Sequence, residues 1–503
     1  MKGDFTRDTF DKTRNISRVL MQQGRVQLDA DFNEQAAILL HYVRTLARDL
    51  GGPHWGPADK DDLGFTLSDG DDGNFIIGPG RYYVDGILVE NYAQVKFLDQ
   101  ESLRGLPDGD KDEWLPDAGE TYYAYLDVWE RHITHVQDER LREAALGGPD
   151  TCTRAQVVWQ AKLHEVQPGG ASDPDLEEKK AELTAQIAEL EKQLDGEKDE
   201  AQMKDLQQKI DELKRQLDTL EAPQTPDCAG ASVWLDSLPK LSQAALKARV
   251  QPERGDDDAC SIPPESRYRG PENQLYRVEI HQGSLDPSGN KTDPTFKWSR
   301  DNGSVVFPIV RQQGSAVTVE SLGSDPRTSL QAGDWVEIMD DGLELRGKPG
   351  ILAQVDSVDS VEMAVTLKLP DDAAPEWPSY DEESTTHPLL RRWDHTAVEG
   401  VELSEGAIPV SESADLDEGW IVIEYGIEVQ FQPGGAYRTG EYWLIPARVA
   451  TGRIEWPLES ELPAALPPHG VEHHYAPLGI IVNLLVQTPD CRCVIEPPAC
   501  TSE

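Results

Sequence analysis

An apolar stripe in residues 28–50 restricts the fold more than any other feature of the sequence. Its members recur at steps of three or four residues, the period of one helical face: Leu28, Phe32, Ala36, Leu39, Val43, Leu46 and Leu50. Asp31 and Glu34 have the spacing of a capping box, and Gly51-Gly52-Pro53 is typical of a helix end. We therefore predict a helix whose stripe is covered by the next part of the chain or by another subunit.

The chain is strongly acidic except at its start. Its formal net charge of −45 disfavours nucleic acids and anionic membranes as partners, because both attract clusters of Lys and Arg. The first 25 residues reverse this balance, with six Lys or Arg against three Asp. We therefore expect residues 1–26 to form an arm that docks onto an acidic neighbour, such as a second copy of this protein.

Targeting and membrane signals are missing from the sequence. The residues after Met1 have no apolar core, and no run reaches the roughly eighteen apolar residues of a membrane span. We expect cytoplasmic synthesis and assembly, with no direct membrane insertion.

Most of the chain predicts short antiparallel strands, so the fold class is mainly β and multidomain. The arm and helix (1–56) precede a first β domain (57–170), in which residues 121–133 and 155–166 read as strands. A second β domain spans 263–384; it has a hairpin turn at Asn302-Gly303 and a small barrel at about 330–370. A C-terminal β domain covers 385–503.

Residues 171–222 carry two heptad registers that break near Asp195-Gly196. This pattern favours an antiparallel coiled-coil hairpin, with one long phase-shifted helix as the alternative. A linker at 223–262 follows, with a short helix expected around Leu238–Val250.

Motifs for catalysis are absent, including the P-loop and the nucleophile elbow, and we expect no enzyme activity, no catalytic residue and no cofactor. Asp108, Asp110 and Asp112 have the spacing of the first half of a calcium-binding loop. The second half of that loop fails, because its sixth position is Glu113 and its twelfth is Gly119. A solvated acidic turn is therefore the favoured interpretation.

Three cysteines cluster near the C-terminus. Cys491, Cys493 and Cys500 would bind zinc if His473 or His474 joined them, although the spacing matches no strong zinc pattern. Reduced surface thiols are favoured, with a Cys493–Cys500 disulfide as the alternative in an oxidising medium.

Aromatic side chains in the predicted strands leave a sugar-binding surface open as an alternative, although strand aromatics usually pack in a core. The candidates are Tyr82, Tyr83, Tyr122, Tyr123, Trp129, Tyr437, Tyr442 and Trp443.

Several motifs together resemble one bacterial family encoded among phage-tail-like contractile injection systems. They are MKGDFTRDTFDK with SRVLMQQGRVQLDADFNEQAAILLHY, RYRGPENQLYRVEI, FKWSRDNGSVVFPI, GGAYRTGEYWLIPARVATG and HHYAPLG. The resemblance implies a contractile particle with sheath, tube and baseplate, and it implies no catalytic residue.

The combined expectation is a structural subunit at the baseplate or its surrounding shell, in a particle that is released or membrane-associated. Its partners would be other subunits, including copies of itself in a symmetric ring. The predicted contact residues are Leu28, Phe32, Leu39, Val43, Leu46 and Leu50. A tail-associated receptor- or glycan-binding module and a cell-wall hydrolase are the two alternatives.

Overall fold

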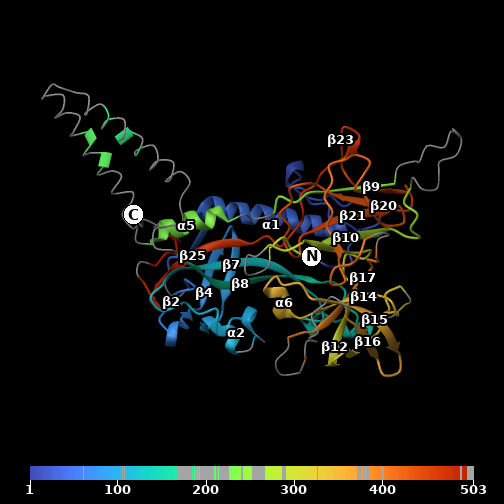
Figure 1. Ribbon diagram of the computed structural model, residues 1–503, viewed down its shortest axis with the longest axis horizontal. Helices are drawn as coiled ribbons and strands as arrows, with labels where there is room; N and C mark the ends of the chain where they lie inside the picture. The colour runs from blue at the N-terminus through green and yellow to red at the C-terminus, as the bar shows by residue number, and fades with distance from the viewer. Residues whose placement is uncertain are drawn as a thin grey trace.

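A computed structural model describes most of the chain in two β-rich bodies and a barrel (Figure 1). The residues outside the description are 60–61, 105, 107, most of 167–225, 239–241, 252–266, 286–290, 324, 326, 371–376, 378–379, 381–385, 398–400, 488–489 and 496–503. Within 167–225 only residues 184, 186–187, 190, 192, 209–210 and 213–214 are described, and all are helical. The predicted coiled-coil hairpin at 171–222 therefore lies almost entirely outside the described residues.

The first body contains three sheets around one core. The first sheet has the order β27-β1-β4-β5, from Val494–Ile495, His54–Pro57, Gly80–Val84 and Ile87–Asn91. The second is β2-β3-β6, from Leu67–Ser68, Ile76–Ile77 and Val95–Lys96. The third is β26-β25-β7-β8, from Leu485–Val486, His474–Val482, Thr121–Ile133 and Arg154–Glu165. Strands from both ends of the chain thus share one core.

The second body packs two sheets against each other. One has the order β18-β11-β10-β21-β22, from Ile408–Pro409, Thr295–Ser299, Gln274–Gln282, Tyr442–Arg448 and Arg453–Ile454. The other is β19-β20-β9, from Ile421–Glu424, Ile427–Phe431 and Leu246–Val250. A small hairpin, β23 (Leu458–Glu459) with β24 (Leu462–Pro463), lies beside them.

A closed barrel forms the third unit. Its strand order is β12-β13-β16-β15-β14-β17, from Val306–Gln313, Ala316–Val319, Ala364–Lys368, Ile351–Asp359, Trp335–Met339 and Leu389–Trp393. The predicted small barrel is therefore present, but it extends beyond residues 330–370. Strands β12, β13 and β17 lie outside that range, and they are needed because a barrel closes only when every strand pairs on both sides.

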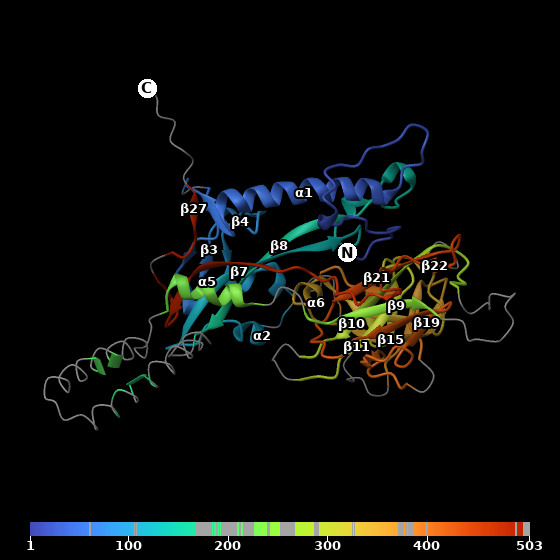
Figure 2. The same ribbon diagram turned by 90° about the horizontal axis from the view of Figure 1, so that it is seen from above.

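Four α-helices have both ends among the described residues. They are α1 (Asp29–Gly51), α2 (Asp108–Asp112), α5 (Cys228–Ser237) and α6 (Asp341–Leu345). Figure 2 shows α1 running along the outside of the molecule, from β4 and β27 toward the second body. None of the helices in the described part of the chain is long and apolar enough to cross a membrane.

Three local expectations differ from the structure. Residues 246–250 form β9 rather than a helix, because they pair with β20, and the short helix lies earlier at α5. Asn302 and Gly303 both have positive φ, as predicted for a tight turn, but β11 and β12 do not pair across them. This turn instead passes the chain from the second body into the barrel. The predicted domain 385–503 is shared among the three units, because β17 closes the barrel and β25 pairs with β7.

Candidate functional site

Helix α1 has two faces, and the first body covers the less apolar one. Its only buried side chains are Ala30 and Ile38, which are eight residues apart and so lie on one helical face. Asp31 accepts from the Leu28 backbone N–H at 3.4 Å, so the helix begins at Asp29 and Asp31 is not the N-cap. Gly52, with φ of 86°, ends it as the Gly-Gly-Pro sequence predicts.

The apolar stripe predicted to be covered faces outward. Its large members are all exposed, with Phe32 78% and Leu50 76% accessible. We call this surface the α1 face: Leu28, Phe32, Leu39, Leu40, Tyr42, Val43, Leu46 and Leu50. The first β domain therefore does not cover the stripe. Exposed apolar side chains arranged in one row are uncommon on a monomer and mark an interaction site.

Polar contacts orient α1 so that this face stays outside. The Arg44 guanidinium donates two hydrogen bonds to Glu130 on β7, at 2.8 and 2.9 Å. Arg48 lies 3.5 Å from Asp85, and the Trp55 indole donates to the Ala47 carbonyl at 3.2 Å. A bidentate Arg–carboxylate pair fixes direction as well as distance.

The first nine residues dock onto their own chain. The Asn302 amide donates to the carbonyls of Met1 and Gly3 at 3.2 and 2.8 Å, and Lys2 lies 3.4 Å from the Glu279 carboxylate. Thr6 donates to Asp29 from both its backbone N–H and its hydroxyl, at 2.8 and 2.5 Å. The expectation that the whole arm docks onto a neighbour is therefore wrong for residues 1–9, because the second body, the turn that follows it and α1 supply their partners.

The rest of the arm is a basic loop, residues 10–28, that folds back on α1. The Val19 backbone N–H donates to the Gln35 side chain at 2.9 Å. Four of its cations are exposed and form no ion pair with any described residue: Lys12, Arg14, Arg18 and Arg25. Leu20, Met21 and Val26 are exposed among them. The loop thus adds positive charge to the apolar surface that α1 presents.

The candidate calcium residues are not arranged to bind an ion. All three belong to α2, and Asp110 and Asp112, two positions apart on that helix, point in nearly opposite directions. A calcium loop instead wraps its ligands around one point. Within the described residues, no group of three His, Cys, Asp or Glu side chains is placed to hold a metal.

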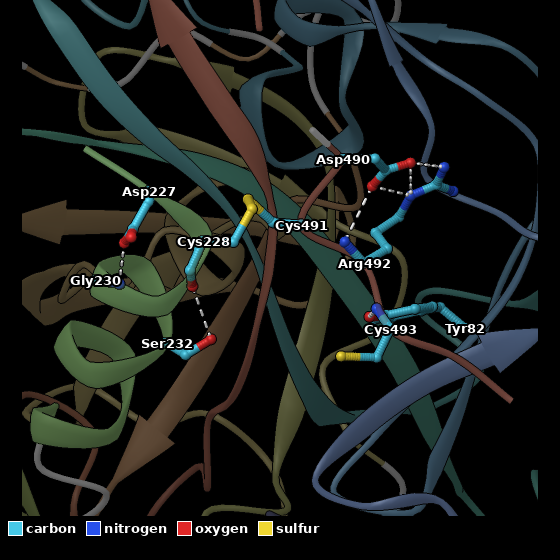
Figure 3. The surroundings of a disulfide bond; sticks show 9 residues. All are labelled: Tyr82, Asp227, Cys228, Gly230, Ser232, Asp490, Cys491, Arg492 and Cys493. Carbon is cyan, nitrogen blue, oxygen red and sulfur yellow. Dashed lines mark hydrogen bonds and ion pairs between the residues drawn. A yellow bond between two sulfur atoms is a disulfide. The ribbon is translucent and has the colours of Figure 1, made fainter. Parts of the chain in front are cut away.

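The candidate zinc cysteines are separated as well (Figure 3). Cys491 forms a disulfide with Cys228, so it is neither a reduced thiol nor a zinc ligand. Cys493 is free and exposed as a residue, and the partial burial of its sulfur raises the pKa of the thiol. Cys500 lies outside the described residues. His473 and His474 diverge, as expected for adjacent residues in an extended chain, and contact Asp127 and Asp85 at 2.7 and 2.8 Å.

The candidate sugar-stacking aromatics mostly belong to the core. Six of the eight are buried: Tyr82, Tyr122, Tyr123, Trp129, Tyr437 and Trp443. The guanidinium of Arg277 covers the ring of Tyr442 at 3.4 Å. These residues therefore do not form an exposed aromatic platform.

Comparison with known proteins gives a family match over the whole chain and a weak match to a solved structure. A solved structure titled "Crystal structure of TssK" shares 10% sequence identity and covers 84% of this chain and 99% of that chain, with a TM-score of 0.14, which is too low to support an argument. No curated protein matches the sequence. A family model described as "Family of unknown function (DUF6519)" matches residues 1–503. The chain therefore belongs to the DUF6519 family.

Proposed function

We propose that this protein is a non-catalytic structural subunit of a phage-tail-like contractile injection particle, at the baseplate or its surrounding shell. The observation that carries the proposal is the α1 face, a row of apolar side chains that the described part of its own chain leaves exposed. The motifs that resemble proteins encoded with such particles supply the setting.

The energetics favour a cover from outside the chain. Burying one large apolar side chain contributes about 1.5–3 kcal/mol, so a row of them offers a substantial gross driving force for association. Part of this gain is lost to the entropy of association. Because Arg44 and Arg48 hold the opposite side of α1 against the first body, the helix cannot roll its stripe inward without breaking those pairs.

The charge beside the α1 face defines the partner. The four cations of the basic loop, which pair with no residue that the structure describes, match an acidic surface, and the adjoining stripe matches an apolar one. A neighbouring subunit with an apolar groove bordered by carboxylates meets both requirements. High salt would weaken the attraction between the opposite charges of such a contact, because salt screens exposed charges, but it would leave the burial of apolar surface unaffected.

Substitution within the α1 face tests the proposal. We expect Val43→Glu and Leu46→Glu to leave the folded chain intact but to remove it from particles purified from the native host. A carboxylate at either position would be desolvated in the contact and repelled by the acidic partner. Incorporation is measured by mass spectrometry of the particles and by cryo-EM density at the baseplate.

Val361 provides the matched control. It is 85% exposed on the turn between β15 and β16, far along the chain from α1, so Val361→Glu should enter particles normally. Incorporation of the α1-face variants at the level of the unmodified chain would rule out this contact. Absence of the unmodified chain from particles would rule out the structural role itself.

A further inference from the structure

A cavity of about 300 Å³ lies where the arm, the first body, the second body and the barrel meet. The label of the N-terminus marks this region in Figure 2, between the two bodies. His132 on β7, Arg277 and Glu279 on β10, and Lys297 on β11 line it, and Lys2 of the arm closes one side. The volume suits a small ligand.

Buried ion pairs form the inner wall of the cavity. Lys297 lies 2.6 Å from Glu337 on β14 and 3.6 Å from Glu279. Arg277 donates to the other oxygen of Glu279 at 2.5 Å, and Lys2 lies 3.4 Å from this carboxylate. Glu337 also accepts from the Gly350 backbone N–H on the oxygen that faces Lys297, and from the Trp393 indole on its other oxygen.

Cations outnumber carboxylates on this wall. Lys2, Arg277 and Lys297 share two carboxylates, Glu279 and Glu337. Arg391, the cross-strand neighbour of Glu337, lies nearby; its guanidinium donates to the Gly303 carbonyl, and Glu344 is the carboxylate that most opposes its charge. Its Nε is buried without a hydrogen-bond partner. Three cations that share two buried carboxylates leave an excess of positive charge on the wall, which a bound anion would offset.

The histidines beside the cavity report the same positive potential. Burial first, and then the nearby positive charges of the N-terminus, Arg391 and Lys2, together lower the pKa of His132 to about 3. Burial, followed by the charge of Lys297, lowers the pKa of His281 to about 3. Both imidazoles are therefore neutral at pH 7. The Nε2 atom of His132 has no hydrogen-bond partner in the described structure.

The mouth of the cavity is mixed in charge. Arg44 and Glu130 neutralise each other there through their bidentate pair. Glu344 and Lys348 also lie at the mouth. Lys348 is exposed and forms no ion pair with the described residues. Because solvent screens exposed charges more than buried ones, the inner wall dominates the potential that a ligand would meet.

We propose that this cavity binds a small oxyanion, a carboxylate or phosphate ligand held by Lys2, Arg277 and Lys297. Two or more oxygens on one anion match several cationic donors that converge from different elements. This site is independent of the α1 face. An anion there would link the arm to the second body and the barrel.

Thermal unfolding of the full chain, with inorganic phosphate or succinate as the probe, tests the site. Added salt alone stabilises so acidic a protein by screening self-repulsion, so sodium chloride at equal ionic strength is the reference. We expect a saturable rise in Tm beyond that reference. A rise with phosphate alone identifies a phosphate site, and a rise with both identifies a general oxyanion site.

Two variants and one control locate the binding. Lys2→Gln should raise the apparent Kd for the anion about tenfold, because it removes one charge-assisted hydrogen bond. Lys348→Gln, at the exposed mouth, should fold normally and raise the apparent Kd by a smaller factor than Lys2→Gln. Arg14→Gln, on the basic loop, should leave it unchanged. No rise beyond sodium chloride with either anion, or equal weakening by Arg14→Gln and Lys2→Gln, would overturn the proposal.

Discussion

Helices α1 and α5 both lie against the first body, but they are held in opposite ways. In α5, Ala231 and Leu235 are buried, the Trp234 ring stacks on His164 with centroids 3.9 Å apart, and a disulfide joins Cys228 to Cys491. In α1, ion pairs hold one side and the apolar row faces out. The comparison indicates that α5 stabilises its own chain, whereas α1 is positioned for a partner.

The largest expected effect comes from breaking the covalent link of α5. Cys228→Ser opens a disulfide between residues 263 positions apart, and we expect the free energy of unfolding of the first body to fall by about 4 kcal/mol, because a long closed loop restricts the unfolded chain. Denaturant unfolding with and without reductant measures this. Cys152→Ser removes an exposed free thiol and is the control. Equal stability of both variants would show that the disulfide does not anchor α5.

A pair of substitutions in α1 sharpens the contrast between its faces. Ile38→Ala should lower the free energy of unfolding by about 3 kcal/mol, because it leaves a cavity at a buried site. Phe32→Ala should change it by less than about 0.5 kcal/mol, because that ring is exposed in the isolated chain. Amide hydrogen exchange in α1 measures the change in local stability for both variants. A large loss from Phe32→Ala would mean that the α1 face is covered within the monomer.

The smallest expected effect is a pH dependence at α5. Burial lowers the pKa of His164, so the unfolded chain binds a proton more readily than the folded one. This stability is present above the ordinary histidine pKa of about 6.5 and is lost as the pH falls below it. Hydrogen exchange of α5 at pH 7.5 and 5.5 measures the loss, and His164→Gln should reduce it. Equal pH dependence in His164→Gln would assign the effect to other groups.

Local patterns in the sequence predicted several elements correctly. The segment 121–133 matches β7 exactly in its bounds, because alternation with aromatic and β-branched residues is a property of neighbouring positions. The tight turn between β4 and β5 is equally local: Asp85 and Gly86 both have positive φ, a conformation that an Asp-Gly pair favours. The period of residues 28–50 likewise predicted α1.

Partners distant in the sequence were not predictable in this way. The Asn302-Gly303 turn was recognised, but not that it joins two units and binds the arm through its side chain. The Cys228–Cys491 disulfide and the cavity around Lys297 were missed, because each joins residues whose proximity depends on the packing of whole sheets. No spacing within one segment signals such a contact.

The sequence by itself determined that residues 28–50 form an amphipathic helix, and it located several strands and tight turns, β7 among them. Only the tertiary structure decided which side of α1 is covered. Periodicity defines a face but not the direction in which it points, and that direction is set by Arg44 pairing with Glu130, 86 residues away. The same holds for the inner wall of the cavity, where Lys2 meets Glu279 only because the folded sheets bring them together. Propensity acts between near neighbours, whereas charge pairing and burial depend on the three-dimensional arrangement.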